Sequence, residues 1–163
     1  KSPSNDYLSV FTDINESRLE EVSKKYGASI FRGDDLYGAD VDIYAPCALG
    51  ATVNDDTINR IKAKVIAGAA NNQLANEVIH GQILKEKGIL YAPDFLINAG
   101  GIINVYGEIA KYDKAEAMRR TENIYNTTLA IFELASSKGL TTHQAAFAMA
   151  EERIEQRKKE NAK

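Results

Sequence analysis

The sequence predicts an α/β fold, in which helices flank a doubly wound parallel sheet and further helices follow it. Two observations support this prediction. Up to about residue 111, short β-rich or apolar runs alternate with helical stretches of about a dozen residues, as in a series of βαβ units. Between about residues 113 and 160 only helical patterns remain. Residues 1–163 are therefore interpreted as one domain with a sheet-forming part and a helical C-terminal part.

The composition is that of one soluble globular domain. Of the 163 residues, 44% are hydrophobic and 26% are charged, which is enough apolar material for a core. The formal net charge of −3 and the pI near 5.5 argue against a nucleic-acid partner. A single cysteine excludes an internal disulfide and fits a reducing compartment. Neither a signal peptide nor an apolar run of ~20 residues is visible, so we expect a cytoplasmic protein without a membrane partner.

Five runs are expected to form strands, because they are rich in β-branched or other apolar residues and are bounded by turn residues. They span residues 8–12, 28–31, 42–45, 64–70 and 89–92. Pro93 is expected to end the last strand, since proline cannot donate a backbone hydrogen bond to a sheet. The crossovers between parallel strands should be right-handed.

Helices are expected between and after these strands, where apolar residues recur at helical spacing. Asn15 is expected to cap the first helix and Gly27 to end it. Thr141 and Gln144 have the spacing of a capping box for the last helix. Between these two helices, the pattern predicts a helix starting at residue 55 or 56, one over 75–87, one from 102, and one long helix over 113–137.

Three residues with reactive or metal-ligating side chains receive a structural interpretation. His80 and His143 have no cysteine or carboxylate at ligand spacing, so we expect surface or interface positions and no metal site. Cys47 has no base close to it in the sequence, and we expect a small buried apolar side chain rather than a nucleophile.

Ligands of open α/β sheets bind outside the carboxyl ends of the strands, and three of these ends carry polar candidates. Asp13 follows the first strand, where an acid can accept hydrogen bonds from a ribose and repel the 2′-phosphate of NADP, although aspartate is also a common turn former. Asn71 and Asn72 follow a buried strand and should hydrogen-bond backbone or ligand. Asn98 precedes a pair of glycines and could bond a carboxamide.

Three segments in this order closely resemble the glutamate/leucine/phenylalanine/valine dehydrogenase family, in particular its members that act on leucine. They are DIYAPCALGA (42–51), VIAGAANNQL (65–74) and YAPDFLINAGGIINV (91–105). The likeness runs from about Leu8 to near the C-terminus. The resemblance implies a Rossmann-like cofactor domain and NAD-dependent oxidative deamination of L-leucine and other branched-chain L-amino acids to 2-oxo acids and ammonia.

The resemblance also implies roles for single residues. Those expected to contact NAD are Asp13 and Ile14 at the adenosine ribose, Cys47, Ala48 and Leu49 along the cofactor cleft, Ala70, Asn71 and Asn72 at the nicotinamide ribose, and Asn98 at the nicotinamide. Ile102 and Val105 are expected to face the substrate side chain, and two aliphatic residues there suit a branched apolar amino acid. A phenylalanine or valine dehydrogenase, and a non-catalytic nucleotide-binding or interaction module, stay open as alternatives.

The sequence departs from the family pattern at its beginning. The G-x-G-x-x-G turn expected about 20 residues before Asp13 is not present, because only seven residues precede Leu8. The family's N-terminal substrate domain, with the catalytic lysines and acid, is likewise missing, so we expect the chain alone to be inactive. In the strand order 3-2-1-4-5-6 the missing strand is central. We therefore expect a divided sheet that is unstable, repaired by non-native pairing, or held by another copy or another polypeptide. The resemblance implies that the enzyme is a homo-oligomer.

Overall fold

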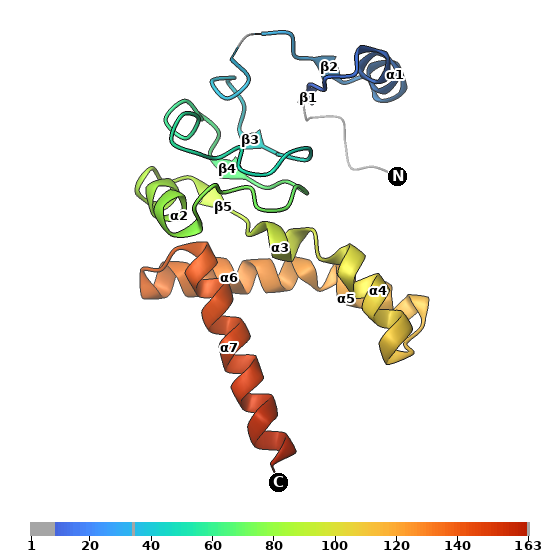
Figure 1. The fold of residues 1–163 in the computed structure, drawn as a ribbon, viewed down its shortest axis with the longest axis vertical. Helices are drawn as coiled ribbons and strands as arrows, with labels where there is room; N and C mark the ends of the chain where they lie inside the picture. Colours follow the sequence, from blue (N-terminus) through green and yellow to red (C-terminus); the bar gives the residue numbers. More distant parts are fainter. Residues whose placement is uncertain (1–8, 34, 163) are drawn as a thin grey trace. The chain divides into compact units, whose positions relative to one another are not determined.

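The computed structural model describes residues 9–33 and 35–162. It separates into two compact units, Lys1–Gly38 and Ala39–Lys163. The first unit contains a two-stranded sheet and the second a three-stranded sheet (Figure 1). All the pairings are parallel, and the α/β class is therefore confirmed. The expected division of the sheet is also observed, because no strand in the described residues joins the two sheets.

The first unit consists of β1 (Val10–Phe11), α1 (Glu16–Tyr26) and β2 (Ser29–Ile30). The side chain of Asn15 accepts a hydrogen bond from the backbone N–H of Arg18, and Gly27 ends the helix with φ of 69°, so both expected helix boundaries are confirmed. Leu19 is the only described residue of this unit that is buried. Tyr26, expected on the apolar stripe, is 67% exposed. The first unit therefore has almost no hydrophobic core.

The second unit is built on the strand order β3-β4-β5, with bounds Ile43–Tyr44, Val65–Ile66 and Leu90–Tyr91. Val65 pairs with Ile43 on one side and Leu90 on the other, so β4 is the central strand. Ile66 is fully buried there. The strands lie where the sequence predicts them but are shorter. Helix α2 (Glu77–Glu86) connects β4 to β5, and Asn76 caps it through hydrogen bonds from the N–H groups of residues 78 and 79.

The connection between β3 and β4 differs from the predicted helix. Residues 55–60 form successive hydrogen-bonded turns instead. The side chain of Asn54 accepts hydrogen bonds from the N–H groups of Asp56 and Thr57, and the Thr57 hydroxyl donates to the carbonyl of Thr52 at 2.6 Å. These side chains compete with helical backbone bonds and favour turns. The apolar residues of the segment, Ile58 and Ile61, are nevertheless buried.

The C-terminal part contains α3 (Asp94–Ile97), α4 (Gly100–Ala110), α5 (Lys114–Glu122), α6 (Ile124–Lys138) and α7 (Thr142–Asn161). The single helix expected over 113–137 is wrong, because the chain breaks at Asn123 into α5 and α6. Helix α5 packs against α4, whereas α6 packs against α3 and α7, so the two halves have different packing partners. Three large apolar side chains of these two helices are exposed, namely Met118, Tyr125 and Leu129.

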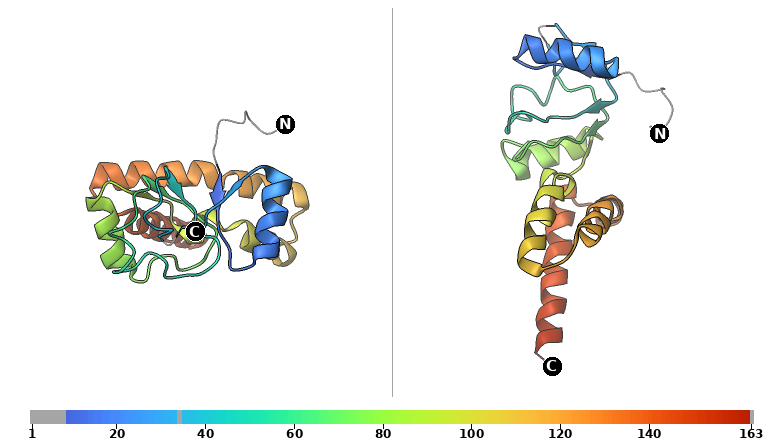
Figure 2. Two further views of the ribbon diagram at one scale, coloured as in Figure 1. Left: turned by 90° about the horizontal axis from the view of Figure 1, so that it is seen from above. Right: turned by 90° about the vertical axis from the view of Figure 1, so that its right-hand side faces the viewer.

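Helices α6 and α7 pack around a small core of Ile131, Ala135, Ala145 and Ala146. The capping box at the start of α7 is confirmed in both directions. From residue 150 to 162 every residue is exposed, and this end of α7 projects from its contact with α6 (Figures 1 and 2). Two large apolar side chains of α7, Phe147 and Ile154, are exposed as well. No helix in the described part of the chain combines the length and apolar character of a membrane span.

The position predicted for His80 is wrong, since this residue is 3% exposed. Its Nδ1 accepts a hydrogen bond from the N–H of Asn76 at 2.9 Å, and its Nε2 lies 3.1 Å from Oδ1 of Asp55. The imidazole thus connects the start of α2 to the preceding turns. These two contacts give both ring nitrogens a partner and so compensate for the burial of His80. His143 lies against the rings of Phe95 and Phe147.

Candidate functional site

The loops after β3 and β4 approach each other at the level of the backbone. The N–H of Ala70 donates to the carbonyl of Pro46 at 2.9 Å. A Cβ atom at Gly68 would lie 2.1 Å from that same oxygen, so only glycine allows this approach. The carboxyl ends of the two strands are therefore held together without intervening side chains.

The turn after β4 is held from inside by Gln73. This side chain is fully buried, and its Nε2 donates to the carbonyls of Gly68 at 2.6 Å and Ala70 at 2.9 Å. Asn72 has φ of 53°, and its carbonyl accepts from the N–H of Ala51 at 2.7 Å. Non-glycine residues rarely adopt a positive φ, so the surrounding bonds must hold the turn in this shape.

Asn71 and Asn98 meet at the surface above these turns. Nδ2 of Asn98 donates to Oδ1 of Asn71 at 2.5 Å and to the carbonyl of Ala69 at 3.2 Å. Among the described residues, Nδ2 of Asn71 and Oδ1 of Asn98 have no hydrogen-bond partner. The sequence predicts a backbone or ligand partner for Asn71, whereas its partner in the structure is the side chain of the other candidate amide, Asn98. Asn72 contributes its backbone groups to this network.

Sequence reasoning missed Asp94, which is hydrogen-bonded to the turn that carries Asn71. We refer to Asn71 and Asn98 together as the amide pair. Asp94 begins α3 and is 8% exposed. Its Oδ2 accepts from the N–H of Asn72 at 2.6 Å, and its Oδ1 accepts from the hydroxyl of Tyr91 at 2.8 Å. The available signal was an acid directly after Pro93 at the end of a strand, a position that faces the ligand side of an open sheet.

Burial of Tyr91, and secondly its hydrogen bond to Asp94, raise the pKa of this phenol. The folded chain therefore holds the phenolic proton more tightly than the unfolded chain, whose tyrosines titrate near pH 10. The stability that results is present below pH 10 and is lost as the pH rises above it, because only the unfolded state then releases this proton.

Replacing Tyr91 with phenylalanine should make the free energy of unfolding less dependent on pH above 10. We expect the wild-type chain to lose up to about 1.4 kcal/mol per pH unit more than the variant in this range. At pH 7 the variant should be less stable by about 1–2 kcal/mol, since Asp94 loses a donor. Urea unfolding at a series of pH values measures both effects. Tyr26→Phe is the control, because Tyr26 is exposed; equal pH dependence in wild type and Tyr91→Phe would contradict the assignment.

The other predicted contact residues lie on exposed segments. Cys47 is exposed, which corrects the prediction of a buried side chain. It follows β3, which is an edge strand of its sheet. Ala48 and Leu49 are exposed beside it. Ile102 and Val105 lie on α4 and are 70% and 59% exposed.

Asp13 and Ile14 belong to the first unit, in the turn between β1 and α1. Ile14 is fully exposed. Oδ1 of Asp13 accepts from the N–H of Asn15 at 2.9 Å, so the residue does act as a turn former. Its role toward a ribose stays a prediction.

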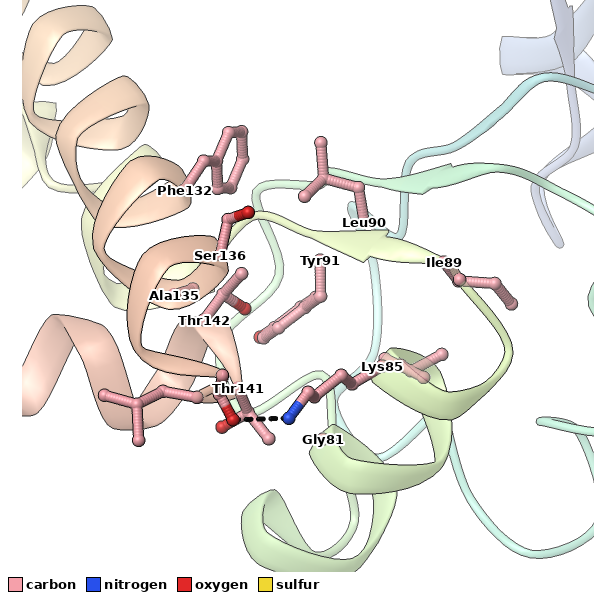
Figure 3. A pocket seen from close by; sticks show the side chains of 14 residues that line it. Gly81, Lys85, Ile89, Leu90, Tyr91, Phe132, Ala135, Ser136, Thr141 and Thr142 are labelled. Carbon is pink, nitrogen blue, oxygen red and sulfur yellow. Dashed lines mark hydrogen bonds between the residues drawn. The ribbon is translucent and has the colours of Figure 1, made fainter.

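A cavity of about 270 Å³ is lined by none of the predicted contact residues, although Tyr91 forms part of its wall (Figure 3). It is bounded by the end of α2, the start of β5 and the junction of α6 with α7. Ile89, Leu90 and Phe132 supply apolar walls, and Nζ of Lys85 donates to the carbonyl of Gly139 at 2.5 Å. Since parallel strands present ligands at their carboxyl ends, this cavity is not the expected cofactor position. No cluster of His, Cys, Asp or Glu suited to a metal ion occurs within residues 9–33 and 35–162.

Comparison with known proteins agrees with this architecture. The family model described as Glutamate/Leucine/Phenylalanine/Valine dehydrogenase matches residues 7–161. The chain belongs to this family. The family membership covers both units and all of the predicted site residues.

Curated relatives within the family share about half of the aligned residues. An L-tryptophan dehydrogenase of Nostoc punctiforme is 50% identical over 152 residues, which are 93% of this chain and 43% of that protein. A leucine dehydrogenase of Bacillus cereus is 51% identical over 145 residues, or 89% of this chain and 39% of that protein. The chain thus spans less than half the length of these relatives.

Solved structures place the fold in the same family. The crystal structure of L-tryptophan dehydrogenase from Nostoc punctiforme matches with a TM-score of 0.89 and 49% identity, over 93% of this chain and 45% of that one. A hetero-hexameric glutamate dehydrogenase from Thermus thermophilus matches with a TM-score of 0.63 at 22% identity, over 86% of this chain and 36% of that one. The second likeness shows the fold alone. The Rossmann-like interpretation of the sequence is supported by both.

Proposed function

We propose that the chain forms the cofactor-binding part of an NAD-dependent amino-acid dehydrogenase, an oxidoreductase that acts on a CH–NH2 group. The reaction converts an L-amino acid, water and NAD⁺ to a 2-oxo acid, ammonia, NADH and a proton. NAD accepts the hydride when bound. The residues of this chain bind and orient that cofactor, and they contribute to the wall that faces the substrate.

The hydrogen-bonded pair of Asn71 and Asn98 is the observation that supports this function most directly. Asn71 lies in the turn after β4, and Asn98 follows α3, the short helix after the neighbouring strand β5, so both lie at the edge where open α/β sheets bind ligands. Nδ2 of Asn71 offers a donor and Oδ1 of Asn98 an acceptor. Oδ1 of Asn98 can accept from an N–H of a nicotinamide carboxamide, and Nδ2 of Asn71 can donate to a hydroxyl of the adjoining ribose. In the same part of the chain, the exposed residues Cys47, Ala48 and Leu49 present small or apolar surface for the ribose and ring, whereas Ala70 is buried beneath the surface.

The preference for NAD over NADP rests on Asp13 and its neighbour Ile14 in the first unit. Oδ1 of Asp13 is used by the turn, which leaves Oδ2 to accept from a ribose hydroxyl. A carboxylate at this place would repel the 2′-phosphate of NADP.

Leucine and other branched-chain amino acids are the proposed substrates. The exposed aliphatic side chains of Ile102 and Val105 suit a branched apolar side chain and offer no partner to a substrate carboxylate such as that of glutamate. An aromatic amino acid is the second candidate, because the tryptophan dehydrogenase relative is as similar to this chain as the leucine dehydrogenase relative.

The proton-transfer groups of the reaction are proposed to lie outside this chain, so the purified chain should not form NADH from leucine. A homo-oligomer is the proposed assembly of the whole enzyme. The Thermus thermophilus relative, described as hetero-hexameric, supports assembly in general.

Cofactor binding is tested by titration calorimetry on the purified chain, with circular dichroism on the same sample. We expect NAD to bind and NADP to bind at least about tenfold more weakly, the factor that about 1.4 kcal/mol of repulsion produces. Asp13→Asn should narrow this difference. A folded chain that binds neither nucleotide would contradict the proposal.

Substrate choice is tested in a chimera, in which this chain replaces the homologous segment of the Bacillus cereus leucine dehydrogenase. We expect kcat/KM for leucine to exceed that for tryptophan and phenylalanine. A chimera that prefers tryptophan would favour the aromatic alternative, and Ile102→Ala would then identify whether this position sets the preference.

A further inference from the structure

Asp94 is bonded to both turns that carry the amide pair. Its carboxylate accepts from the backbone N–H of Asn72 at 2.6 Å. Its backbone carbonyl accepts from the N–H of Asn98 at 3.0 Å. Asn98 in turn donates to Oδ1 of Asn71 at 2.5 Å, and Asn71 is joined to Asn72 by a peptide bond. Three hydrogen bonds and this covalent link therefore close a ring of four residues.

The ring is under a conformational constraint that Asp94 helps to maintain. Asn72 has a positive φ, which costs of order 1 kcal/mol for a residue with a side chain. The bonds that act on this residue are the one from its N–H to Asp94 and the one from Ala51 to its carbonyl. A short bond to a carboxylate is stronger than one to a neutral oxygen. The hydrogen bond to Asp94 thus fixes the peptide group that joins Asn71 to Asn72.

We propose that Asp94 is a positioning residue, which holds Asn71 and Asn98 in the arrangement that receives the nicotinamide. This inference rests on the proposed function of the amide pair. Asp94 itself does not reach the cofactor surface, since it is 8% exposed and both carboxylate oxygens already accept hydrogen bonds from the chain. Tyr91 donates to the second oxygen and orients the carboxylate from below.

Two substitutions separate the carboxylate's geometry from its charge. Asp94→Ala removes both acceptors and should release the turn. Asp94→Asn keeps an acceptor for Asn72, and its amide group can donate to the oxygen of Tyr91. The asparagine variant should therefore restore most of what alanine loses. Thr141→Ala serves as a control for general destabilisation, because it removes a helix cap outside the ring.

The first measurement uses the ¹⁵N-labelled chain without ligand. In Asp94→Ala the side-chain amide signals of Asn71 and Asn98 should move, and the backbone amide of Asn72 should exchange with solvent at least about tenfold faster. In Asp94→Asn and Thr141→Ala these signals should stay close to wild type. Unchanged Asn71 and Asn98 signals in Asp94→Ala would overturn the inference whether or not the chain binds a nucleotide.

The second measurement titrates the same samples with nicotinamide mononucleotide and, separately, with AMP. Asp94→Ala should weaken binding of the mononucleotide by about tenfold and leave the affinity for AMP unchanged. Asp94→Asn should recover most of the lost affinity. If Asp94→Ala weakens the binding of both ligands equally, or if Thr141→Ala loses as much affinity for the mononucleotide, the role of Asp94 is purely structural and the inference is overturned. A wild-type chain that binds no mononucleotide would instead overturn the proposed function, and the ligand-free signals would still decide the positioning role.

Discussion

Replacing Gly68 with alanine should destabilise the second unit by about 3 kcal/mol or more. A Cβ atom at this position would lie 2.1 Å from the carbonyl oxygen of Pro46 and 2.5 Å from its nitrogen, and both are backbone atoms that no rotamer change can move away. The loops after β3 and β4 would have to separate by more than about 1 Å to reach ordinary contact. The cost combines overpacking with weakened bonds from Ala70 to Pro46 and from Ala67 to Tyr44.

Gly81→Ala is the matched control for this substitution. Gly81 is also buried, but a Cβ there would meet its nearest neighbours at 3.9 Å, which is ordinary contact. It lies inside α2, where alanine is favoured over glycine by up to about 1 kcal/mol. Urea unfolding followed by circular dichroism should therefore show a lower midpoint for Gly68→Ala and an equal or higher one for Gly81→Ala. A Gly68→Ala chain within about 0.5 kcal/mol of wild type would contradict the close approach of the two loops.

Backbone amides of the first unit should exchange with solvent roughly a thousandfold faster than comparable amides in the second. Leu19 is the only buried residue described in the first unit, and a two-stranded sheet with one helix buries too little apolar surface to be stable by itself. The second unit buries Ile58, Ile66 and Leu84 almost completely. Local opening should therefore cost several kcal/mol less in the first unit.

Two strand amides of similar geometry allow a direct comparison. The N–H of Phe31 donates to the carbonyl of Phe11 at 2.8 Å, and the N–H of Ala92 donates to that of Ile66 at 2.9 Å. Hydrogen exchange followed by NMR should find Ala92 protected and Phe31 barely protected. Equal protection would mean that the first unit is stabilised by something other than its own core, such as a second copy of the chain. Protection of Phe31 that increases with added NAD would support the proposed role of Asp13.

The candidate site was predictable where it depends on strand ends. Asn71, Asn72 and Asn98 stand out in the sequence because amides directly after buried strands require partners. Asp94 was missed, because an acid after a proline is equally typical of an ordinary turn. Its importance depends on the bond to Asn72, which lies 22 positions away in the sequence.

The sequence by itself determined the elements whose causes are local. Asn15, Gly27 and the pair of Thr141 and Gln144 act on backbone groups within a few positions, so their caps could be predicted and are confirmed. The order of the strands could be predicted from local patterns as well, whereas the family was recognised from the three segments 42–51, 65–74 and 91–105.

Only the tertiary structure decided which side chains are buried and which of them meet. The break at Asn123 depends on the different packing partners of α5 and α6. The buried His80 meets Asp55, 25 positions earlier, and the amide pair joins residues 27 positions apart. Periodicity within one segment carries no information about such neighbours, because they are brought together by parallel strand pairing and helix packing.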